Sequence, residues 1–155
     1  MMAMAGIGMV SPLLPIFVRD DLGGPLLRRA VEIDPGNAAA HHALGLLLVR
    51  QDRAPRAIES FRLAVDLAPG NSRFGYVYAV SIHSAGRPTD ALRELERTHA
   101  VNPADRDVLT ALIMFHREAG NLGAAIGFAE KLVAAAPDDP AAVRLLEELR
   151  GGRGR

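Results

Sequence analysis

The chain has 155 residues, of which 49% are hydrophobic and 5% aromatic, with no Trp. This composition favours helices built from Ala, Leu and Val over a β-sandwich, which uses more Tyr, Thr and Trp. The 18 basic and 18 acidic residues cancel, so no global field attracts nucleic acid or an anionic membrane surface. Because cysteine is absent, the chain cannot itself form a disulfide, a thiolate nucleophile, a Cys-ligated zinc site or a covalent c-type haem link.

The first 18 residues carry no charged side chain, and Ser11 is their one polar residue. Such a run just reaches the length of a membrane span. It nevertheless contains Gly and Pro, and no basic residue precedes it as in a signal peptide. Pro12 and Pro15 would also break a helix over residues 4–17. We therefore interpret residues 1–24 as an irregular apolar segment that covers the next helix; a targeting or anchoring role, or a fragment of a longer repeat protein, are open alternatives.

Prolines recur along the chain at intervals of 34 residues, at Pro35, Pro69, Pro103 and Pro137. Proline ends a helix because it lacks an N–H and its ring clashes with the preceding turn. Each of the four is followed within two residues by Asn or Asp, which are good N-caps. Each phrase therefore predicts the end of one helix and the start of the next.

A second helix breaker lies midway through each 34-residue unit. Gly86 and Gly120 suit the left-handed residue that ends a helix, and Pro55 and Pro88 suit the first turn of the following one. The pattern predicts helices at residues 25–34, 38–51, 54–67, 72–85, 88–101, 106–119, 122–135 and 140–150. The last helix turns Val143, Leu146 and Leu149 inward and charged residues outward, as a capping helix does.

The pattern within these units resembles the tetratricopeptide repeat family of bacterial type. The best-matched unit carries the family's motif at His41, Leu44, Gly45, Leu48, Ala57, Phe61, Ala64 and Pro69. Two further units match in phase but more loosely. The resemblance implies an all-α, right-handed α-solenoid with repeats at 38–71, 72–105 and 106–139, an orphan helix at 25–34, a capping helix at 140–150 and a disordered tail at 151–155. Gly45 and several Ala residues are expected to let the paired helices approach closely.

No constellation of catalytic residues is found in the sequence. Gly6 and Gly8 begin a dinucleotide-type glycine pattern, but no strand can precede them and Pro12 follows where a helix should run. Asp138 and Asp139 precede a helix, so capping explains them better than catalysis. The arginines form no stripe with interleaved aromatics, which disfavours nucleic-acid binding. We predict that the protein is not an enzyme and needs no cofactor.

The five histidines do not form a recognisable metal site. His41 and His42 are adjacent and would point about 100° apart on a helix. The others, His83, His99 and His116, have no His, Asp or Glu partner four residues further along the chain. We predict no metal, and we expect His41 and His116 to replace aromatic residues of the core.

The resemblance also implies a concave groove lined by the first helix of each pair. The groove residues carried over from the family are His42, Leu46, Val49, Arg50, Arg73, Tyr76, Val80, His83, Thr110, Met114 and Arg117, with Ala39, Ser84, Asp107 and Glu118 beside them. Some family members hold a terminal carboxylate with a Lys/Asn/Arg clamp, but here its places carry His42, Leu46, Val77, Asp107 and Ala111. We therefore expect a mostly apolar track with arginines at its margin.

The leading hypothesis is a protein–protein interaction scaffold that binds a peptide or helix in this groove. The alternative is an accessory tail that packs on its own parent chain or self-associates; repeat tails of larger bacterial proteins, some with haem-bearing domains, are faintly similar. An enzyme is the least favoured reading, and a membrane partner is disfavoured. The absence of cysteine suits cytoplasm or periplasm; the cytoplasm is slightly favoured, and a periplasmic or membrane-associated location is an open alternative.

Overall fold

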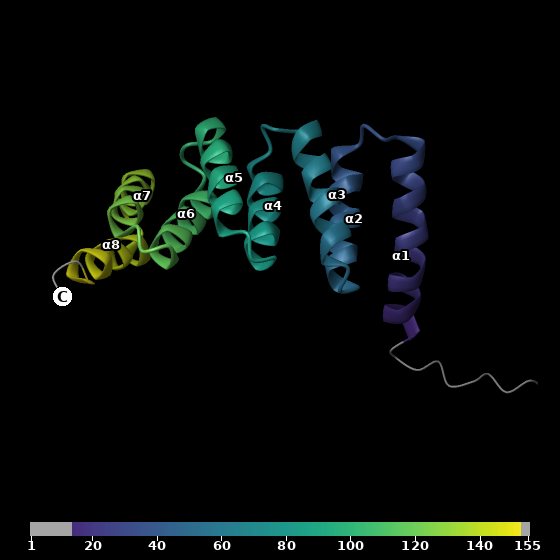
Figure 1. The fold of residues 1–155 in the computed structure, drawn as a ribbon, viewed down its shortest axis with the longest axis horizontal. Coiled ribbons are helices and arrows are strands. Elements are labelled where there is room, and N and C mark those ends of the chain that lie inside the picture. Colours follow the sequence, from purple (N-terminus) through teal and green to yellow (C-terminus); the bar gives the residue numbers. More distant parts are fainter. Residues whose placement is uncertain (1–13, 153–155) are drawn as a thin grey trace, which may run out of the picture.

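A computed structural model describes residues 14–152, and this part of the chain forms eight helices without a strand. They follow one another along an elongated stack, with α1 at one end and α8 at the other (Figure 1). Their bounds are α1 Leu14–Ile33, α2 Ala38–Arg50, α3 Ala54–Leu67, α4 Ser72–Ser84, α5 Pro88–Val101, α6 Arg106–Glu118, α7 Leu122–Ala135 and α8 Pro140–Gly152. The predicted all-α solenoid is confirmed, and the predicted bounds of α2 to α8 agree to within two residues.

The helices pack as consecutive pairs, α2 with α3, α4 with α5 and α6 with α7. First helices begin at capped residues: Asn37 and Asn71 each accept a hydrogen bond from the backbone N–H three residues on, and Asp105 accepts two. The turns inside the pairs contain one residue with positive φ each, at Asp52, Gly86 and Gly120. These three residues are 34 apart, so one turn geometry is repeated, and Asp tolerates it where Gly is absent.

The N-terminal helix differs from its prediction. α1 begins at Leu14 and runs through Pro25, so the prediction of an irregular segment is wrong for residues 14–24, while residues 1–13 lie outside the described part. Pro15 is the second residue of α1, where a missing N–H costs nothing because the first turn has no partner for it. Pro25 removes one hydrogen bond from the helix interior, a local cost that does not end the helix. At the other end, Gly151 and Gly152 belong to α8 instead of the predicted tail, while residues 153–155 lie outside the described part.

The core repeats with the same period as the sequence. Ala57, Ala91 and Ala125 are fully buried at equivalent places in the second helices. The first helix of the first pair comes close at Gly45, where an added Cβ would lie 2.5 Å from the Phe61 ring. The expected role of Gly45 in close helix approach is confirmed.

Neighbouring pairs are also joined at their helix starts. Ser72, the first residue of α4, donates through Oγ to the Asp105 carboxylate at 2.5 Å. One repeat later, Arg106 at the start of α6 donates to Asp139 before α8. Each of these carboxylates therefore caps its own helix and also accepts a hydrogen bond from the preceding repeat. This double contact fixes the spacing between the two repeats.

Candidate functional site

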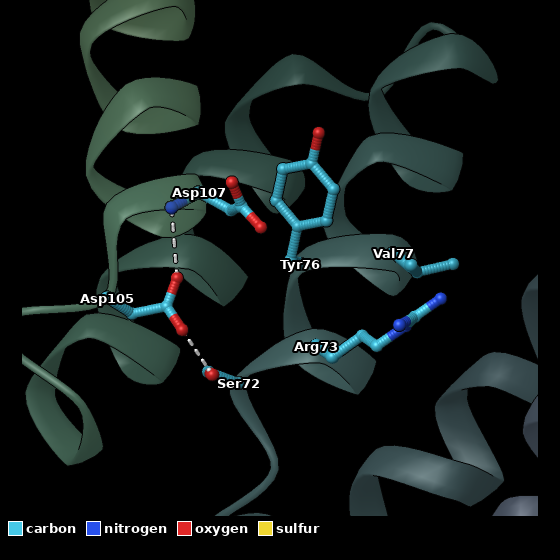
Figure 2. Close-up of a pocket in the computed structure, with 6 residues that line it drawn as sticks. All are labelled: Ser72, Arg73, Tyr76, Val77, Asp105 and Asp107. Atoms are coloured by element: carbon cyan, nitrogen blue, oxygen red, sulfur yellow. Dashed lines mark hydrogen bonds between the residues drawn. The ribbon is translucent and has the colours of Figure 1, made fainter.

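Two adjoining hollows lie on the surface formed by α4 and α6, the first helices of the second and third pairs. The first encloses about 340 Å³ and is lined by Ser72, Arg73, Tyr76, Val77, Asp105 and Asp107 (Figure 2). The second encloses about 220 Å³ and is lined by Tyr76, Val80, Asp107, Thr110, Ala111, Met114 and Phe115. Tyr76 and Asp107 line both, so the two hollows adjoin there, and we refer to them together as the depression.

The polar groups of the first hollow differ in hydrogen bonding and in exposure to solvent. Asp105 is fully engaged: it accepts from Ser72 and from the backbone N–H groups of Asp107 and Val108 at 3.0 and 3.1 Å. Figure 2 shows the Tyr76 ring standing between the side chains of Asp107 and Val77. Arg73 and Asp107 are exposed. A ligand in this hollow would therefore meet one aromatic ring and two oppositely charged groups.

The second hollow is mainly apolar. Val80 comes from α4, whereas Ala111, Met114 and Phe115 come from α6. The Met114 side chain is 44% exposed, high for a large hydrophobic residue on a packed helix. Methionine is flexible and polarisable, so it adapts to partners of different shape.

The structure brings together part of the predicted groove. Arg73, Tyr76, Val80, Thr110 and Met114 line the depression. The α2 members, Leu46, Val49 and Arg50, are exposed but do not line it, and Arg117 is exposed as well. Sequence reasoning did not include Ser72, Asp105 and Phe115. The first two could have been found from the repeat, since the helix starts of neighbouring repeats lie side by side.

Two predicted groove histidines are held by packing. His83 stacks on Phe115 with ring centroids 3.9 Å apart, and its Nε2 lies 2.9 Å from a carboxylate oxygen of Glu118. His42 is 8% exposed, stacks on Phe74 at 4.5 Å and tilts against Phe61 at 5.5 Å. His42 thus contributes to the contact between the first two repeats and lines neither hollow.

The burial of His42 has an electrostatic consequence. Neither ring nitrogen has a hydrogen-bond partner in the described part of the chain. Burial, and next the Arg73 charge, lower the pKa of His42 below its usual 6.5. Burial and the Lys131 charge lower the pKa of His99 in the same direction. The folded protein therefore binds fewer protons at these two sites than the unfolded chain does.

We expect stability to depend on pH through His42. Its contribution is complete above the unfolded pKa of about 6.5 and is lost as the pH falls through that value toward the lower folded pKa. Urea unfolding of the wild type between about pH 7.5 and 5 should show this decline, and His42→Phe should reduce its slope without abolishing it, because His99 remains. An unchanged slope in His42→Phe would contradict the assignment.

The described residues, which lie within 14–152, hold neither a metal cluster nor a helix of membrane-spanning type. No three His, Asp or Glu side chains there lie close enough together to share a metal ion. None of the helices in that range has both the length and the hydropathy that crossing a bilayer requires.

The repeated helix pairs and the depression across two first helices define an α-solenoid repeat protein with a surface suited to protein contacts. Residues 25–72 and residues 83–149 each match a family profile described as tetratricopeptide repeat. The chain belongs to the tetratricopeptide repeat family.

Solved structures share this fold at low sequence identity. The chain superposes on the crystal structure of MamA with a TM-score of 0.76 and 21% identity, covering 90% of this chain and 82% of that one. It superposes on YrrB, described as a TPR protein with an unusual peptide-binding site, with a TM-score of 0.70 and 19% identity, covering 92% and 73%. No curated protein matches the sequence significantly. These similarities establish the fold.

Proposed function

We propose that this protein is a non-catalytic scaffold that binds an apolar peptide or an amphipathic helix in the depression between α4 and α6. Proteins of the tetratricopeptide repeat family are generally interaction scaffolds rather than enzymes. The observation that carries the proposal is that the two hollows adjoin at Tyr76 and Asp107. The unusual peptide-binding site of YrrB supports it by analogy of fold.

The side chains of the depression are of the kind that dominate binding energy. Tyr76 is half-buried, so its ring is already ordered and loses little entropy when a partner covers it. Met114 and Val80 offer apolar surface next to it. A partner that places one large apolar side chain between Tyr76 and Met114 would remove water from Tyr76, Met114 and Val80 at once.

The depression lacks the clamp for a terminal carboxylate that the family resemblance implies. At one of the clamp places that the family resemblance implies, Asp107 supplies a carboxylate instead of a cationic or amide donor. Asp107 attracts a backbone N–H or a basic side chain, and Arg73 is the one cationic group in the same hollow, so a clamp of several donors around a carboxylate is not formed. We therefore expect internal segments of a partner, and not its C-terminus, to be bound.

A display library of peptides of about 15 residues tests the proposal, since this length spans four helical turns. Selection on the wild type should yield binders that lose at least tenfold in affinity, about 1.4 kcal/mol, on Met114→Glu and on Tyr76→Ala. Val101→Glu is the matched control, because Val101 is also exposed but ends the second helix α5. Failure to select any binder, or binders that ignore both substitutions, would refute the proposal.

The same selected peptides also define how far the site extends. Leu46→Glu changes an exposed apolar residue of α2 that does not line the hollows. If the binding site ends at α4, this variant keeps wild-type affinity; a loss would extend the site over all three first helices.

A further inference from the structure

Two opposite charges lie next to Tyr76 in the first hollow. Arg73 is the second residue of α4, and Asp107 is the second residue of α6. They are 34 residues apart, so they occupy the same place in successive repeats. Figure 2 shows the Asp107 carboxylate beside the Tyr76 ring, while the Arg73 side chain extends toward Val77. A partner that lies over Tyr76 therefore meets a positive charge on the α4 side and a negative charge on the α6 side.

Neither of these two charges is balanced by the fold. Within the described part of the chain, the side chains of Arg73 and Asp107 form no hydrogen bond and no ion pair, and both are exposed. By contrast, Arg62 on α3 pairs with Glu59 and with Asp66 at 2.6 Å each. A partner can therefore engage Arg73 and Asp107 without breaking an existing contact.

Arg73 lies at a place where its charge lowers the stability of its own helix. The amino end of a helix carries a partial positive charge, so a cation in the first turn is unfavourable and an anion is favourable. Asp107 thus stabilises the start of α6, whereas Arg73 opposes the start of α4. The Arg73 charge also lowers the pKa of His42, after the larger effect of burial. An anion from a partner would balance Arg73, so Arg73 is the residue that points to a ligand.

The pair of charges has uncharged residues on both flanks. The same place in the repeat is held by Ala39 in α2 and by Ala141 in α8, and both are exposed. Asp107 is the charged residue among those that line the second hollow. Asp105, the other carboxylate of the first hollow, already accepts three hydrogen bonds. The depression therefore offers a partner one unpaired cation, one unpaired anion and apolar surface next to them.

We propose that the partner is an amphipathic helix with an acidic, a large apolar and a basic residue on one face, bound with its acidic residue on Arg73 and its basic residue on Asp107. The apolar residue then lies on Tyr76 and Met114. This inference rests on the proposed binding function, and it adds the charge pattern of the bound segment and its direction along the stack.

The spacing of the two charges fits a helix. α4 and α6 contact each other, and packed helices lie about 8–10 Å apart. Two residues of a helix about seven positions apart share a face and are about 10 Å apart. Residues on one face of an extended strand are about 7 or 13 Å apart, which fits less well. A helix is also more stable when its acidic residue precedes its basic one. We therefore expect the order acidic, apolar, basic within about two helical turns.

Exchanging charges between protein and peptide tests this pairing. The probes are peptides selected on the wild type from the display library. Arg73→Glu should weaken their binding at least tenfold, because attraction becomes repulsion, and a peptide with Lys at its acidic position should recover most of the loss. Asp107→Lys should be rescued in the same way by a peptide with Glu at its basic position. The controls Arg53→Glu and Asp138→Lys make the same changes of charge at exposed residues that line neither hollow, and they should bind as the wild type does.

Milder variants and a fold check keep the result decisive. Arg73→Gln and Asp107→Asn remove each charge without reversing it and should give smaller losses in the same direction. Circular dichroism checks that every variant keeps its helices. Peptides that need Tyr76 and Met114 but ignore both reversals, or whose loss the exchanged peptides do not restore, overturn the charge pairing and leave the binding function standing. A library without any binder instead refutes the binding function itself.

Disulfide cross-linking tests the direction of the bound helix. The chain has no cysteine, so an introduced thiol is the only one present. α2, which carries Ala39, follows α4 on the Arg73 side of the stack, and α8, which carries Ala141, follows α6 on the Asp107 side (Figure 1). A peptide with Cys about seven positions before its acidic residue should link to Ala39→Cys faster than to Ala141→Cys, because that spacing brings the Cα atoms within disulfide reach. The opposite preference, or none, overturns the direction.

Discussion

Replacing Phe61 by Ala should lower the free energy of unfolding by about 3–5 kcal/mol, the largest single-residue effect we expect. Phe61 is 1% exposed and belongs to the core cluster of the first repeat with Leu48 and Ala57. Its ring also lies against His42 and directly over Gly45. Truncation removes the ring from all these contacts and leaves a cavity that the rigid helix pair cannot close.

Urea unfolding followed by circular dichroism measures this loss. Because solenoid repeats contact only their neighbours, the first repeat should unfold before the rest and make the transition broader. The control is Leu67→Ala at the exposed end of the same helix, where we expect less than about 1 kcal/mol. Equal losses at the two positions would show that Phe61 does not have the structural role given to it here.

Gly45→Ala is also expected to destabilise the protein strongly, by about 1–3 kcal/mol. The new Cβ would lie 2.5 Å from one ring carbon of Phe61 and 2.6 Å from another. The ring is buried and cannot swing into solvent, so the two helices must separate. This overpacking exceeds the gain of about 1 kcal/mol that Ala brings to a helix interior.

Gly127→Ala separates the steric clash from the gain in helix propensity. Gly127 lies inside α7, and an added Cβ there meets nothing within 4 Å, so we expect the substitution to stabilise the protein by about 0.5–1 kcal/mol. Phe61→Leu should in turn relieve part of the loss in Gly45→Ala, because the smaller side chain vacates the clashing place. If Gly45→Ala and Gly127→Ala change stability in the same direction, close packing at Gly45 is not decisive.

The sequence alone determined the repeat unit, because the signals that end and start helices are local. The prolines at 34-residue intervals and the Asn and Asp caps predicted α2 to α8 to within two residues. The close approach at Gly45 was also predicted from the sequence. A glycine in the first helix has no side chain, so the second helix of the pair, which carries Phe61, can come close. In contrast, α1 was not bounded correctly, since a proline is harmless in a first turn and the sequence does not show which turn is first.

Only the tertiary structure decided which surfaces are open. His42 and Leu46 lie one turn apart on α2 and were both expected in the groove, yet His42 is enclosed by Phe61 and Phe74 whereas Leu46 is exposed. Likewise, Leu26 and Ser60 occupy equivalent places in the repeat but only Ser60 is covered. Periodicity assigns a residue to a face of a helix, whereas its exposure depends on which neighbouring helix covers that face. Residues about 34 apart supply that neighbour, so the sites for partners follow from the assembled stack.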